Sequence, residues 1–262
     1  MSNQLAFEVY GDSDKPPLII LHGFFASARN WRVVAEKLSA QFRVYVIDQR
    51  NHGGSFHHPR MDYPTLSADL LAFIEQQNLS RVSLLGHSMG GKVAMWFALH
   101  HPEYINKLII ADIAPVSYQH CFDNTIGALQ ALPLNKISNR KQAEEFLVAA
   151  IPELSYRQFL LQNLLLVNGA YRWRVDLDIF QQAAPNIIGF PDSDSVQPFS
   201  DEALFIAGEM SKYVTADAIK MLFPKAHLSV IARAGHWLHV QQADIFIAQV
   251  EDFLLQGSHD NF

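Results

Sequence analysis

A serine between closely spaced glycines is the first feature of the sequence that could do chemistry. Residues 86–90 read G-H-S-M-G, after an apolar run at 82–85 and before an apolar segment at 89–99. This order predicts a buried strand, a sharp turn and a buried helix, with the serine strained at the turn and its hydroxyl above the sheet. The start of the helix would point free N–H groups and its positive dipole end toward the same place. We therefore predict that Ser88 is a nucleophile, against the alternative of an ordinary tight turn.

A nucleophilic serine needs a neighbouring histidine to remove its proton. The chain has 12 histidines, so the surrounding residues have to select one. A predicted strand ends near Ile231, Gly235 permits a turn, and His236 follows on a loop before a terminal helix. His239 is close by, but we expect it to enter that helix. We predict His236 as the general base.

Acyl transfer also needs two N–H donors aimed at the negative charge that develops on the substrate. The residue after the nucleophile, Met89, would supply one of them. The second is expected from the loop after an early strand, where residues 21–25 read L-H-G-F-F and Phe24 is the natural donor. His22 could be read as a second base, but here we expect it to shape the loop.

Short apolar runs and longer helical patterns must position these groups. Near-continuous apolar runs indicate strands buried on both faces of a parallel sheet, and apolar residues at helical spacing between them indicate covering helices. The runs lie at 18–21, 44–47, 82–85, 108–111, 204–207 and 228–231. The pattern breaks at 114–197, which we interpret as an all-helical cap over one end of the sheet, or else as a continuation of the same layer.

These patterns define the predicted organisation of the chain. We expect an α/β core of residues 1–113 and 198–262, with the helical cap at 114–197. The chain has 262 residues, 49% of them hydrophobic, which is typical of a soluble globular protein.

Charge, apolar runs and cysteine content exclude several classes of partner. A net charge of −6 gives no reason to expect nucleic acid or an anionic membrane as partner. We expect neither a signal peptide nor membrane insertion, because no suitable apolar stretch is present. Cys121 is the only cysteine, so we expect a packed or incidental thiol and a reducing, cytoplasmic compartment.

At this point the chain resembles the α/β-hydrolase family over essentially its whole length. The loop at His22, the turn at Ser88 and the late His236 occur in the family's order. Residues 48–55, D-Q-R-N-H-G-G-S, resemble the family's D-x-R-G-x-G-x-S loop, with Asn51 in place of its first glycine. We interpret this loop as mainly structural.

A narrower likeness adds two further stretches. Residues 86–92, G-H-S-M-G-G-K, and 112–118, D-I-A-P-V-S-Y, together with the loop at 48–55 are similar to the YbfF-type bacterial esterases. The family usually carries an aspartate where this chain has Ser211, and the subgroup also has a non-acidic residue there. The resemblance therefore implies that the acid of the triad lies elsewhere.

The acid can be predicted from the end of another strand. Asp112 follows the run at 108–111, so it should emerge at the same carboxyl edge of the sheet as Ser88. The acid orients the imidazole and stabilises its charged form, which does not demand one sequence position. We predict Asp112 and keep Glu209 as the alternative; for Asp112 a purely structural role in capping the following turn is the competing interpretation.

The predicted reaction is hydrolysis of a carboxylic ester through an acyl-enzyme, without cofactor or metal. The aromatic side chains Phe25, Phe146 and Phe159 could line an acyl pocket, although such residues at helical spacing are also common in cores. An acyl-CoA thioester is an alternative substrate, and a catalytically weak ligand-binding protein is an alternative function. Cations that could meet CoA phosphates, or form a solvated face, are Lys136, Arg140, Lys141 and Arg157. The oligomeric state stays open.

Overall fold

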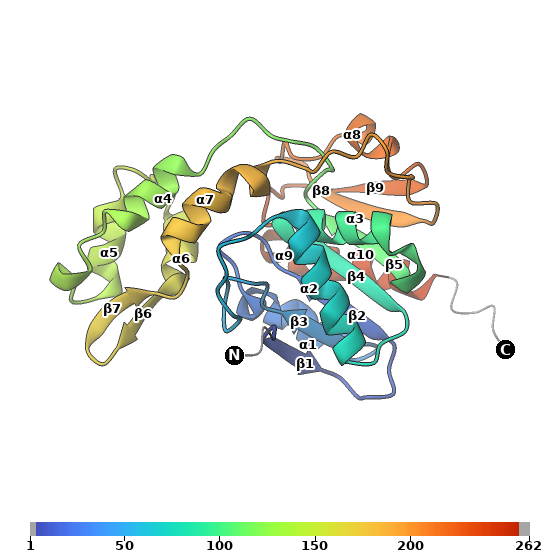
Figure 1. Cartoon of the computed structure of the whole chain (residues 1–262), viewed down its shortest axis with the longest axis horizontal. Helices are drawn as coiled ribbons and strands as arrows, with labels where there is room; N and C mark the ends of the chain where they lie inside the picture. The colour runs from blue at the N-terminus through green and yellow to red at the C-terminus, as the bar shows by residue number, and fades with distance from the viewer. Residues whose placement is uncertain (1–3, 257–262) are drawn as a thin grey trace.

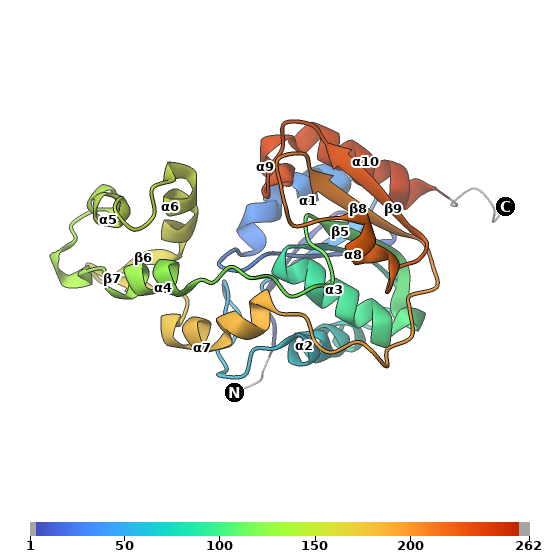
Figure 2. The ribbon, with the colours of Figure 1, turned by 90° about the horizontal axis from the view of Figure 1, so that it is seen from above.

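The computed structural model describes residues 4–256, which form a mostly parallel seven-stranded sheet covered by helices on both faces (Figures 1 and 2). The strand order is β1-β3-β2-β4-β5-β8-β9; β1 pairs antiparallel with β3, and the other neighbours are parallel. The predicted α/β fold with a parallel sheet is therefore confirmed. The strands are β1 (Phe7–Tyr10), β2 (Pro17–Leu21), β3 (Arg43–Ile47), β4 (Val82–His87), β5 (Ile105–Ala111), β8 (Ala203–Gly208) and β9 (Ala226–Ile231).

Successive residues of a central strand pack into two different hydrophobic clusters, which explains the continuous apolar runs. On β2, Ile19 and Leu21 join one cluster, whereas Leu18 and Ile20 join the other. Because side chains alternate across a strand, both faces need covering helices. Helices α2 and α3 cover one face, and α1 and α10 cover the other (Figure 2). The helices of this part are η1 (Ala28–Trp31), α1 (Arg32–Leu38), α2 (Tyr63–Gln76), α3 (Met89–His100), η2 (Pro102–Tyr104), α8 (Ala216–Lys220), α9 (Leu238–Gln241) and α10 (Ala243–Leu255).

The residues between β5 and β8 lie to one side of the seven-stranded sheet, and α7 leads back toward it (Figures 1 and 2). We call residues 114–197 the cap segment; its boundaries stay a prediction. Its elements are α4 (Asp123–Gln130), η3 (Leu134–Lys136), α5 (Arg140–Leu147), α6 (Leu154–Leu160), η4 (Leu161–Asn163), β6 (Leu164–Val167), β7 (Ala170–Trp173) and α7 (Leu177–Ile188).

The cap segment is not entirely helical, so that expectation is wrong at one place. Strands β6 and β7 pair antiparallel, with Val167 opposite Ala170. Asn168 and Gly169 between them have φ of 51° and 80°, the left-handed values that a two-residue hairpin turn requires. Within residues 4–256, none of the helices is both long and apolar enough to cross a membrane.

Candidate active site

Ser88 lies at the sharp turn between β4 and α3, in a strained conformation. Its φ is 53° and its ψ is −120°, values that cost a non-glycine residue energy and that recur at functional sites. Strand and helix pass so closely that a Cβ on Gly86 would lie 2.3 Å from the carbonyl oxygen of Gly90, and one on Gly90 would lie 2.3 Å from that of Leu21. The two glycines therefore permit the turn that holds the serine above the sheet.

A chain of hydrogen bonds connects Ser88, His236 and Asp112. His236 Nε2 lies 3.0 Å from Ser88 Oγ, and His236 Nδ1 lies 2.7 Å from Asp112 Oδ2. The three residues follow β4, β9 and β5, whose carboxyl ends meet at one edge of the sheet. The structure thus brings together three residues that are up to 148 positions apart in the sequence.

Asp112 is fully buried and accepts hydrogen bonds on both carboxylate oxygens. Gly208 N–H donates to Oδ1 at 2.9 Å, and the Ser211 hydroxyl donates to Oδ2 at 2.5 Å. Ser211 occupies the position where the family usually carries the acid. Its side chain contacts the carboxylate of Asp112, which directly follows β5. The alternative acid, Glu209, is exposed and accepts a hydrogen bond from the main chain of Arg233 instead.

His87, directly before the nucleophile, holds the loop that carries His236. Its Nε2–H donates to the main-chain oxygen of His236 at 2.8 Å, and the two rings are 4.8 Å apart. Burial lowers the pKa of His87 to about 3, so the ring is neutral at physiological pH. His239 lies in the short helix α9, just before the terminal helix α10 that it was expected to enter, and it stacks on Trp31 with ring centroids 4.2 Å apart. The role of His87 was not predicted, because its partner is a main-chain carbonyl.

The two predicted oxyanion donors follow strand ends beside Ser88. Met89 is the first residue of α3, where a helix leaves its N–H groups free. Phe24 follows β2 and is almost fully buried. Beneath this loop, His22 Nε2 accepts from the main-chain N–H of Gln49 at 3.1 Å, and the Gln49 side chain donates to His22 O at 2.6 Å. His22 therefore shapes the loop, in line with its expected structural role.

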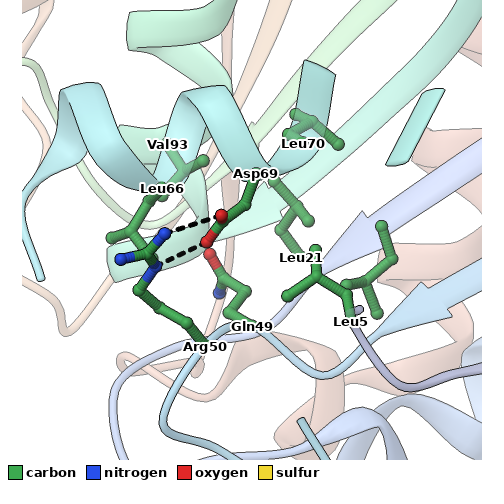
Figure 3. A pocket seen from close by; sticks show the side chains of 9 residues that line it. Leu5, Leu21, Gln49, Arg50, Leu66, Asp69, Leu70 and Val93 are labelled. Atoms are coloured by element: carbon green, nitrogen blue, oxygen red, sulfur yellow. Dashed lines mark hydrogen bonds and ion pairs between the residues drawn. The ribbon is translucent and has the colours of Figure 1, made fainter. Parts of the chain in front are cut away.

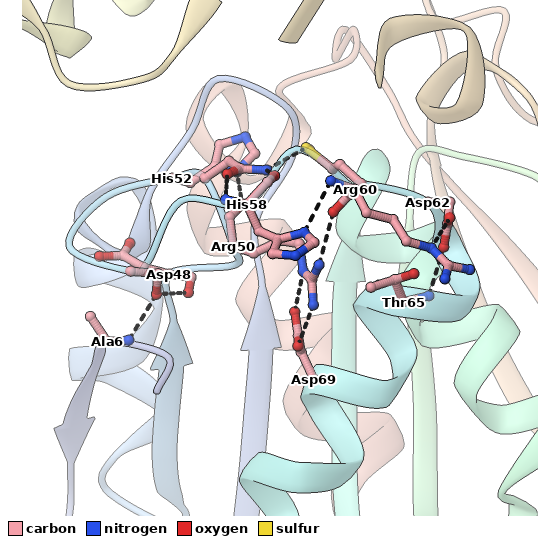
Figure 4. Close-up of polar contacts among 12 residues, drawn as sticks. Ala6, Asp48, Arg50, His52, His58, Arg60, Asp62, Thr65 and Asp69 are labelled. Carbon is pink, nitrogen blue, oxygen red and sulfur yellow. Dashed lines mark hydrogen bonds and ion pairs between the residues drawn. The ribbon is translucent and has the colours of Figure 1, made fainter. Parts of the chain in front are cut away.

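The segment around residues 48–60, which contacts the loop of Phe24 through His22, is itself held by polar contacts (Figure 4). Arg50 forms a bidentate ion pair with Asp69 of α2, with N–O distances of 2.5 and 2.6 Å (Figure 3). It also donates to the main-chain oxygen of Arg60 at 2.8 Å. Asn51, with φ of 66°, donates to and accepts from the main chain of His58. These contacts are consistent with the structural role expected for the loop at 48–55.

A cavity of about 890 Å³ opens above Ser88 and is lined by both the core and the cap segment. Of the residues predicted to bind substrate, Phe25 and Phe159 line it. Phe146 does not: its side chain is 56% exposed, because Leu147 and not Phe146 lies on the buried face of α5. Cys121 also lines the cavity, and it is exposed rather than packed.

Lys92 connects α3 to the returning end of the cap segment. Its Nζ donates to the carbonyl oxygens of Ile188 and Gly189 at 2.7 and 2.6 Å, and the Tyr63 hydroxyl donates to that of Ile187 at 2.6 Å. Burial lowers the pKa of Lys92 to about 7. Among the described residues that line the cavity, Lys92 is the only lysine or arginine.

Residues 16–243 match the family described as "alpha/beta hydrolase fold". The chain belongs to the α/β-hydrolase family. A solved structure described as a marine microorganism esterase is 41% identical to this α/β hydrolase, with a TM-score of 0.91 over 96% of this chain and 100% of that one.

Two relatives identify a narrower group within the family. Esterase YbfF of Escherichia coli (strain K12) is 33% identical over 91% of this α/β hydrolase and 92% of its own length. The sn-1-specific diacylglycerol lipase ABHD11 of Xenopus tropicalis is 36% identical over 95% of this chain and 82% of its own. The α/β hydrolase is therefore of the YbfF type and is an esterase- or lipase-type enzyme that acts on ester bonds.

Proposed function

We propose that this α/β hydrolase is a serine carboxylesterase that works through an acyl-enzyme, with Ser88 as nucleophile, His236 as base and Asp112 as acid. The observation that carries the proposal is the hydrogen-bond chain from Ser88 Oγ through His236 to Asp112. A carboxylate on Nδ1 favours the tautomer that leaves Nε2 free to accept the serine proton. The acceptor atom lies 3.0 Å from that hydroxyl, within the reach that proton transfer needs.

The proposed reaction has two stages. Ser88 Oγ attacks the ester carbonyl as its proton moves to His236 Nε2, and the N–H groups of Met89 and Phe24 stabilise the oxyanion. His236 then gives the proton to the leaving alcohol, which leaves an acyl-enzyme. Water attacks the acyl group with His236 again as base, and Ser88 recovers its proton. In this sequence His236 carries each transferred proton, Asp112 stabilises the charged imidazole, and the two main-chain donors stabilise the oxyanion.

The cavity favours an acyl ester with an apolar acyl group. The rings of Phe24, Phe25 and Phe122 lie 4.6 to 6.3 Å from one another at one part of its lining. Apolar linings of this kind hold hydrocarbon, with few polar groups to fix orientation. The name of one relative, sn-1-specific diacylglycerol lipase, points to the same class of substrate. We propose a neutral acyl ester as substrate.

An acyl-CoA thioester finds less support. Its phosphates need several cations, but Lys92 is the only lysine or arginine among the described lining residues. Arg157 is buried and donates to the carbonyls of Ile151 and Pro152, whereas Arg140 donates to that of Leu164. These two arginines of the cap segment therefore donate to main-chain carbonyls and do not line the cavity.

The test is hydrolysis of p-nitrophenyl esters of increasing acyl length by the wild type and by Ser88→Ala. We expect the substitution to lower kcat/KM by at least about 10³-fold, because the nucleophile is lost while the cavity stays. The acyl length with the highest kcat/KM would then indicate how long an acyl chain the pocket accommodates. Ester turnover that persists in Ser88→Ala would contradict the mechanism. Tight ligand binding with no turnover above that of the variant would favour the ligand-binding alternative.

A further inference from the structure

Phe25, next to the proposed oxyanion donor Phe24, has a main-chain conformation that residues other than glycine rarely adopt. Its φ is 63°, in the left-handed region where the Cβ crowds the main chain. Such a conformation persists only where the surroundings hold it in place. Both polar groups of the Phe25 main chain contact a buried side chain, one from the core and one from the cap segment.

His52 holds the N–H group of Phe25 from the core. Phe25 N–H donates to His52 Nε2 at 3.3 Å, and His52 Nδ1 lies 2.9 Å from the carbonyl oxygen of Arg50. Because a carbonyl can only accept, the proton must be on Nδ1, and Nε2 is left as an acceptor. Burial lowers the pKa of His52 well below its ordinary value, so the ring stays neutral and able to accept.

Asn163 holds the carbonyl group of Phe25 from the cap segment. Asn163 Nδ2 donates to Phe25 O at 2.7 Å, and the side chain is only 4% exposed. Asn163 is the last residue of η4, and its own carbonyl accepts from the main-chain N–H of Arg174 at 2.8 Å, just beyond β7. Its position is thus fixed by the fold of the cap segment itself.

We propose that His52 and Asn163 are positioning residues that hold the main-chain N–H and the carbonyl group of Phe25, respectively, and thereby aim Phe24 N–H at the oxyanion. The inference rests on the proposed serine esterase function. It makes the cap segment part of the catalytic apparatus, since one of the two contacts comes from η4. A donor stabilises the transition state only when it is already aimed at the developing charge. Loss of the Asn163 contact should therefore weaken one donor without touching the triad.

The test compares Asn163→Ala, the near-isosteric Asn163→Asp and His52→Ala with the wild type. For p-nitrophenyl butyrate, we expect kcat to fall about 10- to 100-fold, less than for complete loss of an oxyanion donor, while KM changes little. The affinity for a trifluoromethyl ketone, whose adduct with Ser88 carries an oxyanion, should fall by the same factor as kcat. If Asn163 and His52 only stabilised the fold, kcat and the affinity for the trifluoromethyl ketone would not fall by the same factor.

Gln130→Ala is the matched control within the cap segment. Gln130 is exposed and donates to the exposed Asp178 at 2.7 Å, between α4 and α7, and it makes no hydrogen bond to the Phe25 main chain within the described residues. We expect this variant to keep the wild-type kcat and inhibitor affinity. Thermal unfolding of every variant identifies those that do not fold; if Asn163→Ala is among them, Asn163→Asp and His52→Ala still decide the question.

Two outcomes would overturn the proposal. Folded Asn163 variants that keep kcat within about twofold of the control, or that lose turnover through KM alone, would exclude an effect on the oxyanion. Wild-type turnover no higher than that of Ser88→Ala would remove the esterase function itself, and the inference with it. Because Ser88→Ala is assayed in the same series, the two failures are distinguishable.

Discussion

The Ser88–His236–Asp112 chain and the two buried contacts that Lys92 and Asn163 make between the core and the cap segment differ in kind. On the core side, Ser88, His236 and Asp112 are linked by hydrogen bonds between side chains. Toward the cap segment, two buried side chains donate to main-chain carbonyls instead: Lys92 of α3 contacts the end of α7, and Asn163 of η4 contacts Phe25. In the proposed mechanism the first kind of contact moves and orients protons, whereas the second fixes where a segment lies.

This difference indicates how each side should respond to substitution. A residue in a proton-transfer chain has one protonation state and one tautomer that work, so even an isosteric change is costly. A main-chain carbonyl that loses its donor costs stability or position, but it leaves the triad chemistry intact. We therefore expect core-side changes to lower kcat and cap-side changes to alter stability or substrate range, with Asn163 as the exception.

Asp112→Asn should have the largest effect in the comparison. We expect kcat/KM for p-nitrophenyl esters to fall about 10²- to 10⁴-fold, because an amide N–H facing His236 Nδ1 favours the wrong tautomer. The main-chain geometry should otherwise be kept, since the amide oxygen can replace Oδ1 and accept from Gly208 N–H. Ser211 contacts the same carboxylate oxygen as His236, so its hydroxyl would have to accept from the amide N–H instead of donating. The measurement is kcat/KM near neutral pH, together with thermal unfolding.

Glu209→Gln is the control for that assignment. Glu209 is exposed and contacts only the main chain of Arg233 among the hydrogen bonds of its side chain with the described residues. Its replacement should leave kcat/KM within about twofold of the wild type. If Glu209→Gln lost most of the activity and Asp112→Asn kept it, the acid would be Glu209.

Lys92→Met tests the cap-side contact through stability. Burial lowers the pKa of Lys92 from 10.5 to about 7, so between these pH values the unfolded chain binds a proton that the folded chain does not. The free energy of unfolding should therefore rise as pH increases from about 7 toward 10.5, by roughly 3–5 kcal/mol in total. Lys92→Met should lack this rise. Urea unfolding at pH 6, 7.5 and 9 measures it.

Lys37→Met is the matched control for the pH dependence. Lys37 is half exposed and pairs with an exposed Asp244, and exposed ion pairs contribute little to stability. The free energy of unfolding of Lys37→Met should show the same pH dependence as that of the wild type. Equal slopes for wild type and Lys92→Met would mean that Lys92 is not the group responsible, and that the α7 contact is weaker than its geometry suggests.

Local patterns in the sequence were sufficient to predict the core side. The strands beside Ser88 and Asp112 are continuous apolar runs, and parallel strands bring their carboxyl ends to one edge. Ser88 and Asp112 therefore had to lie near each other, whatever the cap did. The loop position of His236 followed from the glycine before it. The distances between Ser88, His236 and Asp112 are set by the pairing of β4, β5, β8 and β9 in the sheet, and no further pattern in the sequence predicts them.

The cap side was predicted less well, for identifiable reasons. Residues 164–167 read L-L-L-V, which suits either a helix or a strand, and the Asn168-Gly169 pair that marks a hairpin was missed. On α5, Phe146 and Leu147 are adjacent apolar residues about 100° apart around the helix, and only tertiary packing decides which one is buried. Asn163 and Lys92 contact carbonyls, which every residue carries, so their partners leave no pattern in the sequence.

Phe159→Ala and Phe146→Ala together give the smallest expected effect and test the cap side most selectively. Phe159 lines the cavity and lies 5.5 Å from the ring of Trp237, whereas Phe146 is exposed. Removing the Phe159 ring should raise KM about 3- to 10-fold for long acyl esters and less for acetate, since apolar contact area scales with chain length. Phe146→Ala should leave the chain-length profile unchanged. A fall in kcat for every acyl length in Phe159→Ala would instead mean that α6 acts on the chemistry, as proposed for Asn163, and the contrast between the two sides would no longer hold.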